Sequence, residues 1–254
     1  MSAVTHRGRT LWLLGYPTAA LADAERGVAV AREVGHAVNL MYALTLAAFI
    51  QIHCGRLQSA GDMIDEALAL AEEKNSANWK TAGQLARGWI FSLSDNSLDA
   101  VRTLASGLSA NRLSGATVWR PFFLSYEARA LSQLGQIGEA WQRVDEAMTT
   151  IDTLKERVWE AEVHRIAGEI ALASPEADAV KAEAYFDHAL TVARQQQAKS
   201  WELRVAMSMA RLWRDQGKMQ QARELLAPVY GWFTEGFGTR DLKEAKALLE
   251  ELAA

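Results

Sequence analysis

The chain has 254 residues, of which 50% are hydrophobic and 23% are charged, with a net charge of −4 and a single cysteine, Cys54. This composition excludes a disordered chain, and one thiol excludes an internal disulfide. The negative balance argues against nucleic-acid or membrane partners, because binding to phosphate-rich surfaces needs concentrated positive charge. The cysteine usage fits a reducing compartment, so we expect a cytoplasmic location.

Two apolar segments could be mistaken for membrane signals. The run LWLLGY, residues 11–16, is shorter than the roughly 7–15 apolar residues of a signal peptide and stops at Pro17. Segment 37–55 has no formal charge and is long enough to cross a bilayer, but it contains Gln51 and His53 among other polar residues. We predict that this segment is instead a helix buried between two neighbouring helices.

One spacing of small and apolar residues recurs along the chain. In LGQIGEAWQRVDEAM, residues 134–148, a glycine is followed by Ala140, Val144 and Ala147. Together with two small or apolar positions before the glycine, this series starts six times, at intervals of 40, 40, 40, 40 and 42 residues: Gly8, Ala48, Gly88, Ala128, Gly168 and Ala210. Four tryptophans repeat with the same period: Trp79, Trp119, Trp159 and Trp201. A fixed period of this length indicates a solenoid of repeats.

Helical periodicity explains the spacing of small and apolar residues within each unit. Small residues let two antiparallel helices approach closely, and the glycine between them ends the first helix because it tolerates the left-handed conformation. One hairpin cannot bury its apolar stripe alone, so neighbouring hairpins stack and share a core. We therefore predict an all-α fold of stacked antiparallel helix pairs, in which the tryptophans pack between repeats.

The expected elements follow in chain order within a single domain, residues 1–254. A truncated first repeat covers 7–34, five repeats follow, and a terminal capping helix covers 239–252. The five repeats are 37–74, 78–111, 119–154, 157–196 and 200–233. Each consists of two helices, which in the same order are 37–53 and 57–74, 78–93 and 97–111, 119–134 and 138–154, 157–173 and 175–196, and 200–216 and 219–233. The extra residues of the fourth repeat fall in a turn at 174–178. Pro228 should kink or end the last of these helices, because it lacks a backbone donor.

This spacing resembles the tetratricopeptide repeat (TPR) over nearly the whole chain. The unit is about six residues longer than the usual 34 of that family, which is closer to the variant in MalT-like bacterial regulators. Segments 87–93, 195–218 and 225–252 resemble the C-terminal repeat region of bacterial predicted ATPases, which often carry an adenylate or guanylate cyclase domain or a LuxR-type DNA-binding domain. The resemblance implies a right-handed α-solenoid and a regulatory interaction module, without cyclase or ATPase chemistry.

In tetratricopeptide folds the first helix of each unit lines a concave groove. The matching positions in this chain are Tyr42, Phe49, His53, Trp89, Phe122, Arg129, Glu162, Arg165, Glu169, Arg204, Arg211 and Arg214. The resemblance therefore implies a groove that is aromatic toward the N-terminus and rich in arginine toward the C-terminus. Aromatic side chains anchor protein partners and arginine binds carboxylates, so we predict a protein or peptide partner. The alternative is that half of these residues form internal ion pairs or core contacts.

The first repeat has no cap before it. Trp12, Leu14 and Tyr16 could therefore form an open apolar face that is covered by upstream sequence or by a second copy in a homo-oligomer.

Residues for catalysis are harder to find. No phosphate-binding loop occurs, and the five histidines are scattered among the repeats. Glu160 and His164 share a helix face and Glu169 follows about a turn later, but no HExxH motif or Cys/His cluster accompanies them, so we expect no metal and no other cofactor. The sequence thus predicts a non-enzymatic regulatory scaffold that binds a partner segment. A small-molecule-sensing domain and an oligomerisation module remain as alternatives.

Overall fold

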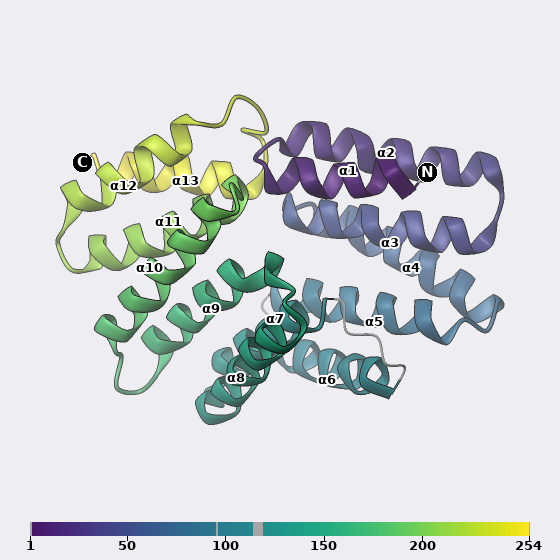
Figure 1. Ribbon diagram of the computed structural model, residues 1–254, viewed down its shortest axis with the longest axis horizontal. Helices are drawn as coiled ribbons and strands as arrows, with labels where there is room; N and C mark the ends of the chain where they lie inside the picture. The colour runs from purple at the N-terminus through teal and green to yellow at the C-terminus, as the bar shows by residue number, and fades with distance from the viewer. Residues whose placement is uncertain (1, 95, 114–118, 254) are drawn as a thin grey trace. The chain divides into compact units, whose positions relative to one another are not determined.

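A computed structural model of the chain describes residues 2–94, 96–113 and 119–253. All regular structure in these residues is helical, which confirms the predicted all-α fold of antiparallel helix pairs (Figure 1). The α-helices are α1 (Ser2–Leu13), α2 (Pro17–Val34), α3 (Ala37–His53), α4 (Leu57–Glu73), α5 (Ala77–Ser92), α6 (Ser97–Leu113), α7 (Arg120–Gln133), α8 (Ile137–Leu154), α9 (Glu160–Ala173), α10 (Ala179–Gln195), α11 (Lys199–Asp215), α12 (Met219–Gly231) and α13 (Arg240–Glu251). A 3₁₀ turn, Arg157–Trp159, precedes α9.

The helices fall into two compact units, the first built from α1 to α6 and the second from α7 to α13. In the first unit, α3 contacts α2, α4 and α5. Most of its apolar residues are buried, and Met41, Leu44 and Ile52 are fully so, as predicted for the uncharged segment. None of the helices in the described ranges has the length and apolar character needed to cross a membrane.

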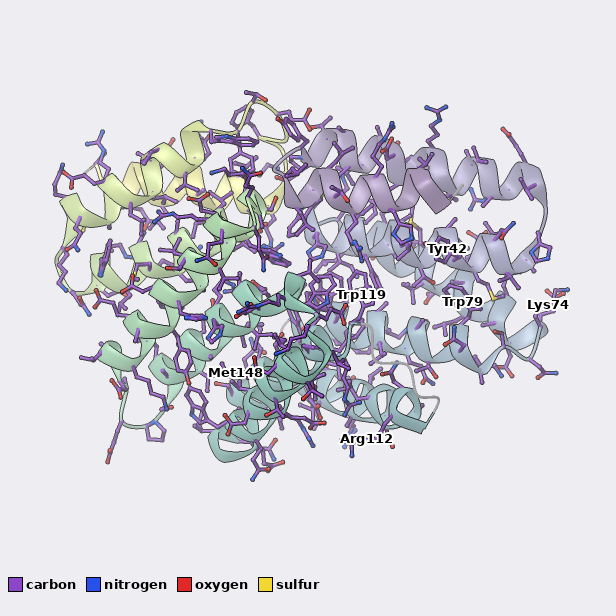
Figure 2. All side chains as sticks on the ribbon, in the orientation of Figure 1. Tyr42, Lys74, Trp79, Arg112, Trp119 and Met148 are labelled. Carbon is purple, nitrogen blue, oxygen red and sulfur yellow. The ribbon has the colours of Figure 1, made fainter. Side chains whose placement is uncertain are left out.

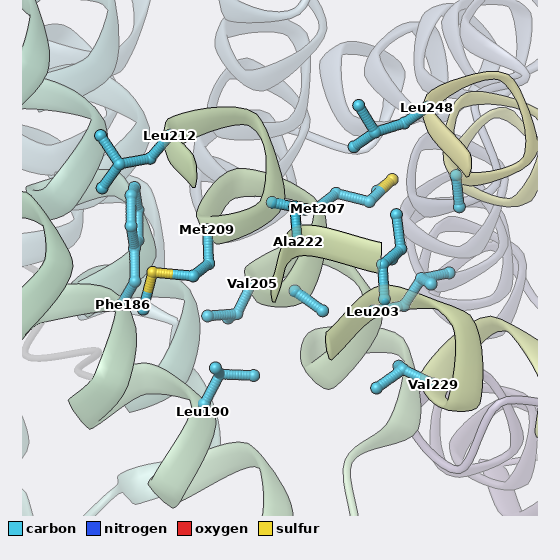
Figure 3. Close-up of a cluster of buried hydrophobic side chains, with 14 of the residues drawn as sticks. Phe186, Leu190, Leu203, Val205, Met207, Met209, Leu212, Ala222, Val229 and Leu248 are labelled. Carbon is cyan, nitrogen blue, oxygen red and sulfur yellow. The ribbon is translucent and has the colours of Figure 1, made fainter. Parts of the chain in front are cut away.

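In the second unit the first helix of each pair contacts the first helix of the next pair, in the order α7, α9, α11 and α13. The shared core lies around α11 (Figure 3). Phe186 and Leu190 from α10 meet Val205 and Met209 from α11 there, and α12 contributes Val229. Chain order therefore determines which helices share a core, as expected for stacked repeats.

Glycine is required in two kinds of position: in turns after a helix and at a close contact between two helices. Gly135 and Gly217 follow the first helices of their pairs with φ of 76° and 77°, the left-handed region that glycine tolerates best. Gly168 lies inside α9, where a Cβ atom would overlap the aromatic ring of Phe186 on α10. The predicted small position is therefore a point of close contact between these two helices.

The repeated tryptophans pack between neighbouring repeats, as predicted. The ring centroids of Trp119 and Trp159 are 4.3 Å apart, and those of Trp159 and Trp201 are 6.5 Å apart. In the first unit, Trp79 meets Tyr42 edge to face at 5.9 Å (Figure 2).

Several helix ends differ from the expected positions, most of them by one or two residues. α1 begins at Ser2, before residue 7. α10 begins at Ala179, not at Pro175, because Asp178 caps it by accepting a 2.8 Å hydrogen bond from the backbone N–H of Lys181. α12 continues past Pro228 to Gly231, since the lost backbone bond lies on an exposed side of the last turn, where water can replace it.

Candidate functional site: a charged face on the first helices

A buried polar network joins the first helices of the second unit. The hydroxyl of Tyr126 on α7 donates a 2.7 Å hydrogen bond to Glu162 Oε1 on α9. Arg165, one turn along α9, donates from Nε to the other oxygen of Glu162 over 2.7 Å. Between α11 and α13, Arg204 Nε donates to Asp241 Oδ2 over 2.7 Å. The Tyr126–Glu162 and Arg204–Asp241 contacts connect residues 36 and 37 positions apart in sequence, close to one repeat.

The charged groups of the network compensate one another. Burial alone would raise the pKa of Glu162, but Arg165 and Arg204 hold that pKa below its ordinary value, so the carboxylate stays charged. Burial and the neighbouring Glu162 raise the pKa of the Tyr126 hydroxyl, which therefore remains a donor. A buried charge set of this kind fixes the register of the helices and leaves little for an external ligand.

Toward solvent the network continues as three partly exposed ion pairs. Arg129 Nη1 lies 3.8 Å from Glu169 Oε2, Arg211 Nη2 lies 3.0 Å from Glu244 Oε2, and Arg214 Nη1 lies 2.6 Å from Glu251 Oε2. We call these six residues the charged face. Arg211 lies on the same side of α11 as Arg204 because the two are seven residues, about two helical turns, apart. The buried network and the charged face meet at Glu169, which binds both Arg165 and Arg129.

The structure sorts the predicted groove residues into two sets. Arg129, Glu169, Arg211 and Arg214 belong to the charged face. Glu162, Arg165 and Arg204 belong to the buried network and are 0%, 6% and 7% exposed. Their charges are satisfied internally, so they are corrected from groove positions to structural ones.

The aromatic half of the predicted groove also needs correction. Phe49, His53, Trp89 and Phe122 are buried because they pack against other rings. The ring centroids of Phe49 and His53 lie 5.8 Å and 4.7 Å from that of Trp89. Phe122 lies 4.7 Å from the ring of Trp159. These side chains are core, in accord with the alternative that half of the set forms internal contacts.

Tyr42 remains partly accessible, with its hydroxyl 2.6 Å from His6 Nε2.

The predicted open face at the N-terminus is smaller than expected. Trp12 is only 2% exposed, because it stacks on His53 with ring centroids 3.9 Å apart. Leu14 and Tyr16 are 36% and 37% exposed.

Sequence reasoning missed the acidic partners on the terminal helix. Asp241, Glu244 and Glu251 lie on the predicted capping helix, and each binds an arginine of α11. The signal was available: Asp241 and Glu251 both lie 37 residues after their arginines, Arg204 and Arg214.

A pocket of about 380 Å³ opens beside α12 and α13. Tyr230, Phe237, Lys243, Lys246, Ala247 and Glu250 line it. It contains none of the residues predicted for the groove.

Comparison with solved structures defines the class of the fold. The apo form of RapI matches 98% of this chain and 83% of its own, with a TM-score of 0.66 and 12% identity. Aspartyl phosphate phosphatase F from Bacillus subtilis matches 89% of this chain and 57% of its own, with a TM-score of 0.63 and 14% identity. A Podospora anserina chain described as a kinesin light chain with nearly identical TPR-like repeats matches 85% of this chain and 97% of its own, with a TM-score of 0.51 and 15% identity.

The chain therefore has the fold of TPR-like helical-repeat proteins. At these identities the likeness shows the fold alone. No family model matches the sequence, and no curated protein matches it.

Proposed function

We propose that this chain is a non-catalytic scaffold that binds an acidic segment of a partner protein on the charged face. The observation that carries the proposal is a difference in exposure between the arginines of the buried network and those of the charged face. Arg165 and Arg204 are held in buried ion pairs, whereas Arg211 and Arg214 are 40% and 33% exposed and paired only with exposed carboxylates.

Exposed ion pairs contribute about 0–1 kcal/mol each, so a partner carboxylate can replace Glu244 or Glu251 at small cost. The guanidinium group is suited to this exchange because it binds a carboxylate with two parallel hydrogen bonds. The buried network beneath keeps α11 in place, so the arginines are presented from a rigid helix.

The same proposal places the chain in a larger bacterial regulator. Its repeat length and segments 195–218 and 225–252 resemble MalT-like regulators and the repeat regions of bacterial predicted ATPases. In such an arrangement the repeats would recruit a partner and an attached domain would produce the output.

Charge reversal tests the proposal. The full chain is immobilised, exposed to lysate of the source organism, and compared by quantitative mass spectrometry with the double variant Arg211→Glu/Arg214→Glu. The matched control is Arg223→Glu, which reverses an exposed charge on α12, the second helix of the same pair. We expect specific proteins to be retained by the wild type and the control and lost from the double variant. Equal recovery by all three proteins would refute the charged face as the binding surface.

A further inference from the structure

Two imidazoles and a carboxylate meet on the hairpin of α9 and α10. Glu160 and His164 lie one turn apart on α9, and His188 reaches them from α10. His188 Nε2 is 3.7 Å from Glu160 Oε1, and the ring centroids of His164 and His188 are 4.2 Å apart. One donor atom from each of the three side chains lies within 4.8 Å of the others. Sequence reasoning grouped Glu160 and His164 with Glu169, which instead binds Arg165.

His164 and Glu160 are in the chemical forms that bind a cation. Burial, helped by the neighbouring His188, lowers the pKa of His164 to about 4, so its imidazole is neutral at physiological pH. His164 Nδ1 is buried and has no hydrogen-bond partner in the described part of the chain. A hydrogen bond from Arg157 lowers the pKa of Glu160, so its carboxylate is ionised.

We propose that Glu160, His164 and His188 form a binding site for a borderline divalent metal ion such as Zn²⁺. Imidazole nitrogen and carboxylate oxygen are ligands that such ions prefer, and two histidines with one carboxylate are a sufficient protein set. Metal bonds of about 2.0–2.1 Å require the donors to be about 3.3 Å apart in a tetrahedral site, so side-chain rotation has to bring them closer. His188, whose side chain is 51% exposed, has the freedom to make this movement.

Arg157 is the natural competitor for this site. Its Nε and Nη2 donate to the two oxygens of Glu160 over 2.8 Å and 3.0 Å. Because Arg157 bonds both oxygens, its positive charge opposes a metal ion at the same carboxylate. The side chain of Arg157 is 65% exposed, so water can solvate the released guanidinium at small cost.

The metal ion would link two helices of the same repeat. Glu160 and His164 come from α9 and His188 from α10, so binding would fasten this hairpin and stabilise the folded chain by mass action. Three protein ligands would leave a coordination position for water or for a donor from another molecule on the side of the exposed His188. The three proposed ligands share no residue with the charged face.

Zinc titration of the full chain tests the site. The protein is dialysed against a chelator, freed of it, and titrated with Zn²⁺ by isothermal calorimetry. We expect one ion per chain and a loss of affinity of at least about tenfold in His188→Gln and in His164→Gln. His36→Gln, which changes an exposed histidine between α2 and α3, is the matched control and should bind as the wild type does.

We expect Arg157→Gln to change the affinity for Zn²⁺ in the opposite direction. Removal of the competitor should tighten Zn²⁺ binding severalfold, whereas unchanged affinity would show that Arg157 does not compete with the metal ion for Glu160. His188 is exposed, so its variant should fold even if the His164 variant does not, and circular dichroism checks both. Lack of Zn²⁺ binding by the wild type, or equal affinity in His188→Gln and His36→Gln, would overturn the site.

Discussion

Arg204 and Asp241 form an ion pair between α11 and α13, with 2.7 Å between Arg204 Nε and Asp241 Oδ2 and side chains that are 8% and 12% exposed. Arg204 also lies 3.8 Å from Glu162 on α9. One guanidinium thus connects the first helices of three successive repeats. Both carboxylates would lose their shared positive neighbour if this side chain were removed.

Replacement of Arg204 should therefore be costly. We expect Arg204→Met to lower the free energy of unfolding by about 3–5 kcal/mol, because it leaves the carboxylate of Asp241 without its counter-charge and removes one of the two arginines beside Glu162. Arg214→Ala, which removes a partly exposed arginine from the same helix, should cost about 1 kcal/mol or less. Urea denaturation followed by circular dichroism measures both variants. Similar losses would show that the buried pair has no special role.

The close approach of α9 and α10 predicts an unusual glycine substitution. In a helix, alanine normally stabilises relative to glycine by about 0.5–1 kcal/mol. Gly168→Ala should instead destabilise by about 1–3 kcal/mol, because its methyl group overlaps the Phe186 ring in a packed core.

Gly61→Ala is the control for this substitution, since Gly61 lies within α4 and a Cβ atom there would meet no neighbour within 4 Å. It should raise the midpoint of thermal unfolding while Gly168→Ala lowers it. A stabilising Gly168→Ala would contradict the observed helix contact.

Glu127 should make stability depend on pH in the direction opposite to a typical salt-bridged carboxylate. Burial raises its pKa above the ordinary 4.5, although Arg143 Nε lies 3.2 Å away. The folded state therefore holds this proton more tightly than the unfolded state, so its contribution to stability is present below pH 4.5 and lost as pH rises through the folded pKa.

Glu127→Gln removes this titration. We expect the variant to gain stability relative to the wild type as pH rises from 4 to 7. Denaturation curves at several pH values measure the difference. A difference that is constant with pH, or that changes in the opposite direction, would contradict the raised pKa.

The repeat architecture could be predicted because it depends on short-range rules. Small residues at Gly168 and Ala182, and glycine at Gly135, specify close helices and a left-handed turn without reference to distant residues. The tryptophan spacing likewise indicated packing between repeats.

The candidate sites were less predictable because exposure depends on packing in three dimensions. A helical arginine such as Arg204 has the same sequence pattern whether it faces solvent or a buried carboxylate on the next repeat. His188 was missed for a related reason: its partners lie on the other helix of the hairpin, and the shifted second half of that repeat obscures the alignment.

The central claim is that the repeats of the second unit are joined in chain order through their first helices. A double-mutant cycle between Tyr126 and Glu162 tests it most directly, because these residues are joined by a buried 2.7 Å hydrogen bond across one repeat. For Tyr126→Phe and Glu162→Met we predict a coupling free energy of about 1.5–3 kcal/mol, typical of a hydrogen bond to a charged group. Tyr126→Phe and Gly61→Ala should be additive within about 0.5 kcal/mol. Coupling between Tyr126 and Glu162 no larger than in that control would contradict the arrangement.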